Sequence, residues 1–448
     1  MSYRALLPKQ RVRPYRILTK SPPQWSCLLP NTAVAVAPLR NLTGDPKQQI
    51  LVDDLTHHLV IELFRRCRGF SFAWLPGERR WTSNLSMPNP SELRYVVSGS
   101  VQRGGPHGIL RANIRISDAV TTDYLWAGRQ ELRCEGFGSI QTEITRQVSQ
   151  ALHILALHEA SYRASQSLDA ELEVSECFDR ANAALKKEMR ADLSAEALKW
   201  FLAALGRSPR NVEALVGVAR ACQHLVGNPW WGDPRAVAGA ADLGREAVTI
   251  ALELEPENAF AKYVQGMLYS AAGQLDEAAS AFQQALMMDE ALAVAHAFGG
   301  YNAALLGRAW ETLPSIERAM SLESTERRHS VWYFFAGFAE LLLGQTHEAV
   351  RLLRKSLERN PTYGSAQLFL IAALSVIGPR NEAVILAQSF RQQYTVPPAI
   401  AFEQFWLSRG LLPRPFAPRY FHFSRRSKRS AEHPNRSLYP QLGNRASP

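Results

Sequence analysis

The sequence predicts an α+β protein of two domains: a small mixed α/β domain, and after it an all-α superhelix of repeated helix pairs. Up to residue 155, short apolar and β-branched runs alternate with stretches of helical spacing. From residue 178 onward, one helical pattern recurs at a near-constant period. The chain has 448 residues, 46% of them hydrophobic and 21% charged, and this composition excludes wholesale disorder.

The net charge of +10 is concentrated at the two ends of the chain. Residues 1–31 carry six basic side chains and no acidic one, and residues 409–448 carry nine basic side chains against one acidic. We expect two basic disordered tails, which either contact nucleic acid non-specifically or only keep the protein in solution. The five cysteines are scattered, and neither a secretory signal nor a bilayer-spanning apolar run is visible. These features predict a cytoplasmic protein without a membrane span.

The first predicted elements form a βαβ unit. Residues 32–39 (TAVAVAPL) are apolar, rich in β-branched side chains and followed by turn residues, as a buried strand is. Residues 47–68 place leucine and isoleucine with helical spacing. Residues 70–75 form a second short strand. This part opens the α/β domain, which we expect to span residues 32–155.

Three further strands and a helix complete the predicted domain. Residues 94–101 are strand-like and lead to a pair of glycines. Residues 108–116 alternate apolar and polar side chains, and residues 123–132 are their expected hairpin partner. Residues 138–158 have the apolar spacing of an amphipathic helix. The element order predicts a mixed sheet covered by helices.

After a helical linker over residues 156–177, residues 178–408 contain about six copies of one pattern. In that pattern an alanine or other small residue is followed by a bulky apolar residue four positions on and by a small one three later. The copies end at spacings of 47, 34, 34, 37 and 34 residues. Each helix pair has an apolar stripe that it cannot bury alone, so the pairs stack and share one core. The excess in the first spacing fits a loop over residues 227–239, and residues 401–409 fit a closing helix.

The 34-residue period resembles that of the tetratricopeptide repeat family, most closely over residues 259–290 and 330–361. The first domain resembles the TolB-like amino-terminal domain, in the segments APLRNLTGDP, DDLTHHLVIEL, LRYVVSGSVQRGG, ILRANIRISDAVTTDYLWAGRQE and FGSIQTEITRQVSQAL. In bacteria, that domain precedes such repeats in adenylate-cyclase-related proteins and winged-helix regulators. The resemblance implies a regulatory or interaction half. The cyclase or winged-helix effector does not fit into the 31 residues before the first strand.

The resemblance also implies that the first helices of the repeats line a groove that holds a protein or peptide partner. The family's groove positions fall here on Phe260, Tyr263, Met267, Val294, Tyr301, Val331, Phe334 and Phe338. This lining is aromatic and aliphatic, lacks the Lys/Asn carboxylate clamp of some members, and suits an amphipathic helix or apolar peptide. The alternative is that the same residues pack against the chain's own aromatic segment, which includes Phe402, Phe405 and Trp406.

No residue is expected to be catalytic or to bind a metal or a cofactor. Asp53, Asp54, His57 and His58 share helix faces at i,i+4 spacing, but acidic residues early in a helix are explained by the helix dipole. Ser98-Gly99-Ser100 is not a nucleophile elbow, and the glycines over residues 99–108 do not match a phosphate-binding loop.

The function we expect is that of a non-catalytic protein-interaction or regulatory adaptor in bacterial signalling. The alternative is a truncated transcriptional regulator or adenylate-cyclase-type signalling protein that keeps only its sensory half. In that case the basic run at residues 425–429 is a nucleic-acid contact or localisation signal, and otherwise it is a solvated tail.

Overall fold

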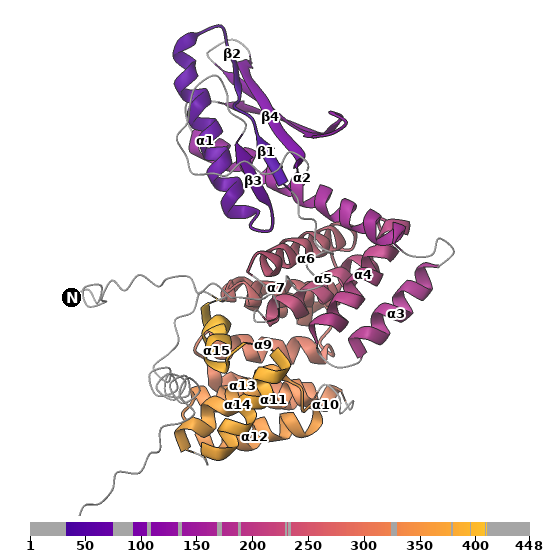
Figure 1. Ribbon diagram of the computed structural model, residues 1–448, viewed down its shortest axis with the longest axis vertical. Helices are drawn as coiled ribbons and strands as arrows, with labels where there is room; N and C mark the ends of the chain where they lie inside the picture. Colours follow the sequence, from indigo (N-terminus) through magenta and orange to yellow (C-terminus); the bar gives the residue numbers. More distant parts are fainter. Residues whose placement is uncertain are drawn as a thin grey trace, which may run out of the picture.

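A small mixed sheet with helices is followed by a helical repeat region, which confirms the predicted fold class (Figure 1). The computed structural model describes residues 33–74, 93–104, 109–132, 137–167, 173–186, 190–228, 231, 234–323, 329–377, 380–394, 396–407 and 409. The predicted N-terminal tail, the C-terminal tail beyond residue 409 and the basic run at residues 425–429 lie outside these residues.

The sheet contains the strands β1 (Ala33–Val36), β2 (Arg40–Leu42), β3 (Ser71–Trp74), β4 (Leu93–Arg103), β5 (Leu110–Asp118) and β6 (Tyr124–Leu132). Its order is β3-β1-β4-β5-β6, and β2 pairs with β4. β1 runs parallel to β3 and β4, and β5 runs antiparallel to β4 and β6. The expected hairpin is present, with Ile114 opposite Gly128 in its register. Alternate β5 side chains are buried because one face of the sheet meets the helices.

Helix α1 (Gln49–Arg66) and helix α2 (Phe137–Gln166) supply the rest of this core. The core side of α1 carries Leu55, Leu59 and Leu63, which are fully buried at helical spacing. Helix α2 extends beyond the expected end at residue 158, because small and apolar side chains continue the stripe through Leu157, Ala160 and Ala164. These three residues pack in the core of the repeat region, so one helix serves two cores.

Six successive helix pairs make up the described repeat region. They are α3 (Val174–Lys186) with α4 (Ala191–Arg207), α5 (Val212–Gly227) with α6 (Pro234–Leu254), α7 (Ala259–Ala271) with α8 (Leu275–Met288), α9 (Ala293–Leu305) with α10 (Thr312–Leu322), α11 (His329–Leu342) with α12 (Thr346–Arg359), and α13 (Gly364–Ile377) with α14 (Arg380–Tyr394). A short 3₁₀ turn, η2 (Pro46–Gln48), precedes α1, another, η5 (Ala309–Glu311), precedes α10, and helix α15 (Pro398–Leu407) follows the last pair.

Glycine in the first helix of a pair makes room for a large side chain from a second helix, either of the same pair or of the pair before it. A Cβ added at Gly266 would lie 2.7 Å from the Phe282 ring, and one at Gly217 would overlap the Phe201 ring. The turns inside the third and fifth pairs also need glycine, because Gly273 and Gly344 have φ values of +79° and +83°. These positions explain the recurrence of small residues in the sequence pattern.

A polar junction joins the α/β domain to the repeat region. The backbone amide of Gly69 donates to the Asp242 carboxylate on α6 at 3.2 Å, and the His153 imidazole on α2 lies 3.6 Å from the same carboxylate. Arg235 donates to the Ser71 hydroxyl at 3.3 Å. In Figure 1, α2 runs from the sheet toward α4 and α6. The two domains are therefore held by hydrogen bonds as well as by the shared helix.

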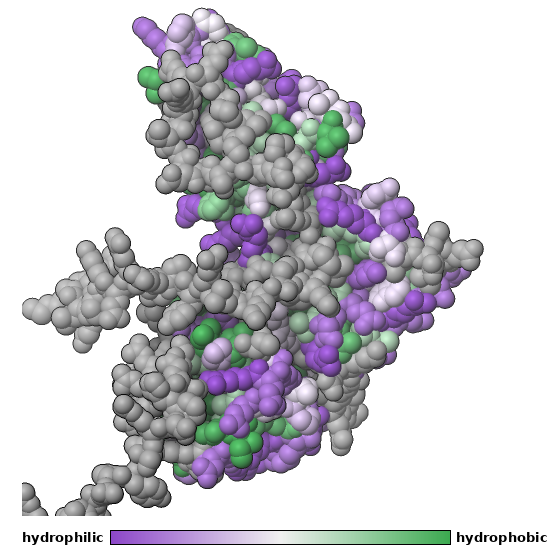
Figure 2. Space-filling model, viewed as in Figure 1, coloured by the Kyte–Doolittle hydropathy of each residue, from purple (hydrophilic) through white to green (hydrophobic). Residues whose placement is uncertain are grey.

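The surface in Figure 2 is mainly hydrophilic over the described residues, with hydrophobic side chains in small groups. Among the described helices, none combines the length and apolarity needed to cross a bilayer.

Candidate protein-interaction site

Successive first helices from α5 to α13 contact one another, and residues of α3, α5 and α7 line a common cavity. We call the surface formed by the first helices, α3, α5, α7, α9, α11 and α13, the first-helix face. The structure places all eight predicted groove residues on α7, α9 and α11. Phe260 and Val331 are half-buried. The other six are buried: Tyr263, Met267, Val294, Tyr301, Phe334 and Phe338. Most of the predicted lining is thus covered by other parts of the chain.

Aromatic rings in mutual contact form a continuous seam along this face. In order along the repeats, the centroid distances are 5.5 Å for Tyr263–Phe298, 4.9 Å for Phe298–Phe335, 4.3 Å for Tyr301–Phe335, 5.4 Å for Tyr301–Phe338 and 5.1 Å for Phe338–Phe369. Such offset and edge-to-face pairs stabilise by more than their buried area alone. We call this set of rings the aromatic seam.

Helix α15 covers the α11–α13 part of the aromatic seam. Phe405 lies 5.0 Å from Phe369 and 6.1 Å from Phe338, and Trp406 lies 5.9 Å from Phe338. Phe402 adds a contact of 5.3 Å with Phe369. Of the two alternatives raised by the sequence, packing against the chain's own aromatic segment is the one seen at Phe338.

Arg409 extends this cover toward the earlier repeats. Its guanidinium is buried, lies 4.0 Å over the Phe405 ring and donates to the Phe405 carbonyl oxygen at 2.8 Å. It also donates to the carbonyl oxygen of Gly227, at the end of α5, at 3.5 Å. Burial raises the pKa of the Tyr301 phenol, and the charge and hydrogen bond of Arg409 oppose that rise. The chain after α15 therefore reaches back from the last repeats to α5 and α9.

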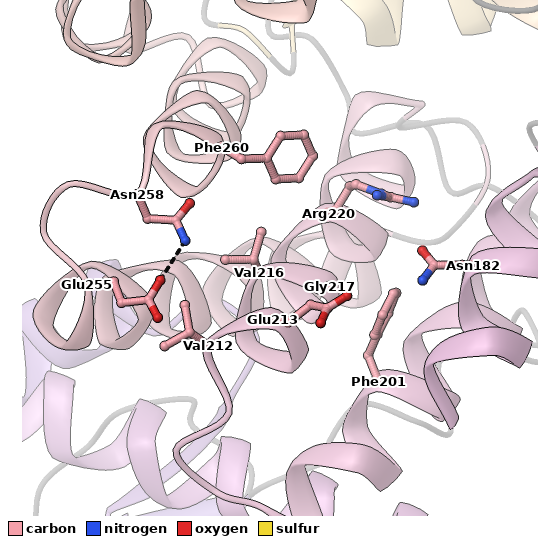
Figure 3. Close-up of a pocket in the computed structure, with 10 residues that line it drawn as sticks. All are labelled: Asn182, Phe201, Val212, Glu213, Val216, Gly217, Arg220, Glu255, Asn258 and Phe260. Carbon is pink, nitrogen blue, oxygen red and sulfur yellow. Dashed lines mark hydrogen bonds between the residues drawn. The ribbon is translucent and has the colours of Figure 1, made fainter. Parts of the chain in front are cut away.

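A cavity of about 300 Å³ hollows the same face where α3, α5 and α7 meet (Figure 3). Aromatic and aliphatic side chains share its wall with amides, carboxylates and a guanidinium. Its lining residues are Asn182, Phe201, Val212, Glu213, Val216, Gly217, Arg220, Glu255, Asn258 and Phe260. Figure 3 shows the Phe260 ring extending from α7 toward α5, with the Arg220 and Asn182 side chains facing each other on the opposite side.

The walls of this cavity are held by local hydrogen bonds and packing. Asn258 accepts from the backbone amide of Ala261 at 2.9 Å, which caps α7, and its amide donates to Glu255 at 2.8 Å. Burial, assisted by the charge of Arg220 one turn away, lowers the pKa of His224 to about 3. Near neutral pH, His224 is therefore uncharged, and Arg220 provides the positive charge on this part of α5.

The sequence analysis missed the cavity residues on α3 and α5. Counted from the first residue of each helix, Val216 on α5 has the same position as Tyr263 on α7. Asn182 on α3 and Arg220 on α5 have the same position as Met267 on α7. Extending the family's groove positions to the first two repeats would have found them.

Three of the other residues considered for chemistry, Asp53, Asp54 and Ser98, have structural hydrogen bonds. Asp54 accepts from Gln141 at 2.8 Å, which ties α1 to α2, and Asp53 accepts from Gln49 at 2.8 Å. The Ser98 hydroxyl accepts from Arg115 across the β4–β5 pair at 3.1 Å. Within the described part of the chain, no group of three or more His, Cys, Asp or Glu side chains is placed to hold a metal ion.

Comparison with known proteins identifies a tetratricopeptide repeat at residues 261–292, which are α7, α8 and their connections. Among curated proteins, the putative adenylate cyclase 3 of Rhizobium meliloti (strain 1021) is 32% identical over 157 residues. The matched part is 33% of this chain and 25% of that protein, so the chain spans about a quarter of the relative's length.

Two solved structures are similar in fold. TTC0263, a tetratricopeptide protein of Thermus thermophilus, is 21% identical with a TM-score of 0.37, over 45% of this chain and 98% of its own. PilW, a type IV pilus biogenesis factor, is 18% identical with a TM-score of 0.34, over 48% of this chain and 94% of its own.

Proposed function

We propose that the chain is a non-catalytic adaptor in bacterial signalling, acting in the cytoplasm, and that it binds a protein or peptide partner on the first-helix face. The observation that carries this proposal is the cavity between α3, α5 and α7, which is lined from three successive repeats. Peptide-binding sites combine apolar surface with convergent polar groups, and this cavity offers both, since polar and apolar residues contribute about equally to its lining.

The cavity suits one apolar side chain of a partner with a polar group beside it. Phe260 and Val216 offer apolar surface, whereas Asn182 and Arg220 offer hydrogen-bond donors to a carbonyl or carboxylate. We assign the contact residues Phe260 and Val331, which are half-buried, to the partner site itself. The buried residues Tyr263, Met267, Val294, Tyr301, Phe334 and Phe338 shape the face from beneath and are reached only where their cover moves.

We assign the α/β domain to the TolB-like class and give it the role of a second docking surface. Its supporting features are the segments quoted above and the mixed order of its sheet. Because α2 packs in both cores, a partner on this domain would act on the same rigid unit as one on the repeats.

The test is capture of partners from a bacterial lysate, followed by direct binding of a captured, purified protein. Phe260→Ala with Arg220→Ala removes an apolar wall and the charge of the cavity. Met287→Ala with Arg318→Ala makes the same chemical changes on exposed second-helix positions. We expect at least tenfold weaker binding for the cavity variant, about 1.4 kcal/mol, and unchanged binding for the control. Equal affinities of the two variants would exclude the cavity.

A second candidate is favoured by the curated relative: a regulatory half that works with a nucleotide cyclase or a transcription factor. In this case the basic tails contact nucleic acid. Duplex DNA binding that falls steeply with salt and disappears on removal of residues 1–31 and 409–448 would limit the tails to non-specific contacts. A sequence preference that survives physiological salt would favour the regulator over the adaptor.

A further inference from the structure

We propose that α15 with Arg409 is a resident occupant of the first-helix face, and that a partner's amphipathic helix with the same aromatic spacing replaces it. This inference rests on the proposed function and adds its regulation and the chemistry of its partner. The occupying pattern is aromatic at i, i+3 and i+4, followed by a cation three residues later: Phe402, Phe405, Trp406 and Arg409.

The contacts of α15 resemble those of a bound helix more than those of a terminal cap. A closing helix only needs to cover the last pair, α13 and α14, but Phe405 and Trp406 also contact Phe338 on α11. Arg409 lies still further back, at the end of α5. The segment thus crosses from the sixth pair to the second along the face that the repeats otherwise present to partners.

The fit of this occupant is imperfect in its polar groups. The indole nitrogen of Trp406 and the side-chain oxygen of Gln404 are buried, and neither has a hydrogen-bond partner among the described residues. A buried donor or acceptor that lacks a partner costs free energy. A helix that keeps the aromatic contacts and satisfies these groups would therefore displace α15.

The turn glycine of the third pair offers a way to loosen the occupant without touching it. A Cβ at Gly273 would overlap the Arg409 carbonyl group, whereas a Cβ at Gly344 meets no atom within 4 Å. The two residues have nearly the same backbone conformation, with φ of +79° and +83°. Gly273→Ala and Gly344→Ala thus carry the same backbone strain, and only the first one disturbs Arg409.

The experiment measures binding of a fluorescent synthetic peptide of residues 396–408 to the full chain by anisotropy. The peptide keeps the three aromatic residues but ends before Arg409, so the methyl group added at residue 273 clashes with the chain's own segment and not with the peptide. We expect Gly273→Ala to bind the peptide at least tenfold more tightly than the wild type and Gly344→Ala to bind like the wild type. A peptide in which Phe405 and Trp406 are alanine should not bind. Equal affinity of the three proteins would overturn the proposal.

Two further measurements separate the remaining explanations. If Gly273→Ala does not fold, as judged by circular dichroism, the full chain with Phe405→Ala and Trp406→Ala takes its place. Loss of the fold there too would make α15 an integral core element and overturn the proposal. Light scattering that shows dimers of the loosened variant would assign the face to a second copy and likewise contradict a partner helix. These readouts need no identified partner, so their failure is distinct from failure of the cavity test.

Discussion

A cluster of ionisable side chains, several of them buried, forms the contact between α2 and α6. His153 faces Asp242, Glu246 and the Cys67 thiol, and Arg245 pairs with Asp242. Burial by itself would lower the pKa of His153, but the neighbouring Asp242 carboxylate and Cys67 thiol raise it to about 10. Burial raises the pKa of Glu246 to about 7, a rise opposed by the charge of His153 and assisted by that of Glu253.

These raised pKa values predict that the fold loses stability as pH rises. A group whose pKa is higher in the folded chain stabilises it fully below the unfolded value and loses that contribution as pH rises through the folded value. For Glu246 the loss falls between about pH 4.5 and 7 and amounts to at most about 3 kcal/mol. For His153 it falls between about pH 6.5 and 10.

Glu246→Gln removes the ionisable carboxyl of Glu246 and with it the pH-dependent contribution of this group to the free energy of unfolding. We expect the variant to lose less unfolding free energy than the wild type between pH 5 and pH 8, measured by urea denaturation. Glu277→Gln, an exposed change on α8, serves as the control and should follow the wild type. A wild-type pH profile that Glu246→Gln does not flatten would contradict the role given to this carboxyl.

Glycines in several first helices of the described repeats lie against a large side chain of an adjacent second helix. Gly217 on α5 lies against the Phe201 ring of α4, between neighbouring pairs, as Gly266 lies against Phe282 within a pair. This rule follows from the sequence, since it produces the recurring small and bulky positions. The polar cavity beside Gly217 does not follow as easily, because the pattern specifies the packed positions of the helices and not the polar side chains between neighbouring repeats.

Gly217→Ala should destabilise the chain by about 1–3 kcal/mol, because the added methyl overlaps a buried ring. Gly299→Ala on α9 is the matched change, since its Cβ would sit 3.7 Å from the Phe282 Cβ, an ordinary contact. That variant should be neutral or gain up to about 1 kcal/mol from helix propensity. Chemical denaturation measures both, and a Gly217→Ala protein as stable as Gly299→Ala would refute the close packing.

The two domains are joined by the shared helix α2 and by a hydrogen-bonded junction. The sequence predicts each domain separately, since the strands, the hairpin and the repeat period all arise from local apolar spacing. It does not predict the bond between Gly69 and Asp242, which are 173 residues apart. It also ends α2 early, because alanines such as Ala160 and Ala164 give a weak apolar signal although both are buried.

Asp242→Ala should uncouple the domains. The change removes the acceptor of the Gly69 amide and leaves His153 and Arg245 without their carboxylate partner. Loss of one partner from a buried pair costs about 3–5 kcal/mol. We expect a lower melting temperature and two transitions in calorimetry, whereas Asp276→Ala, an exposed change on α8, should keep the wild-type curve. A single unshifted transition in Asp242→Ala would show that the shared helix alone holds the domains together.

The most direct test of partner binding to the first-helix face is hydrogen–deuterium exchange of the full chain, measured alone and with a purified captured partner. The account predicts slower exchange in α3, α5 and α7 when the partner binds, and faster exchange in α15 as that helix is displaced. Protection confined to the second helices or to the sheet, with α15 unchanged, would contradict it.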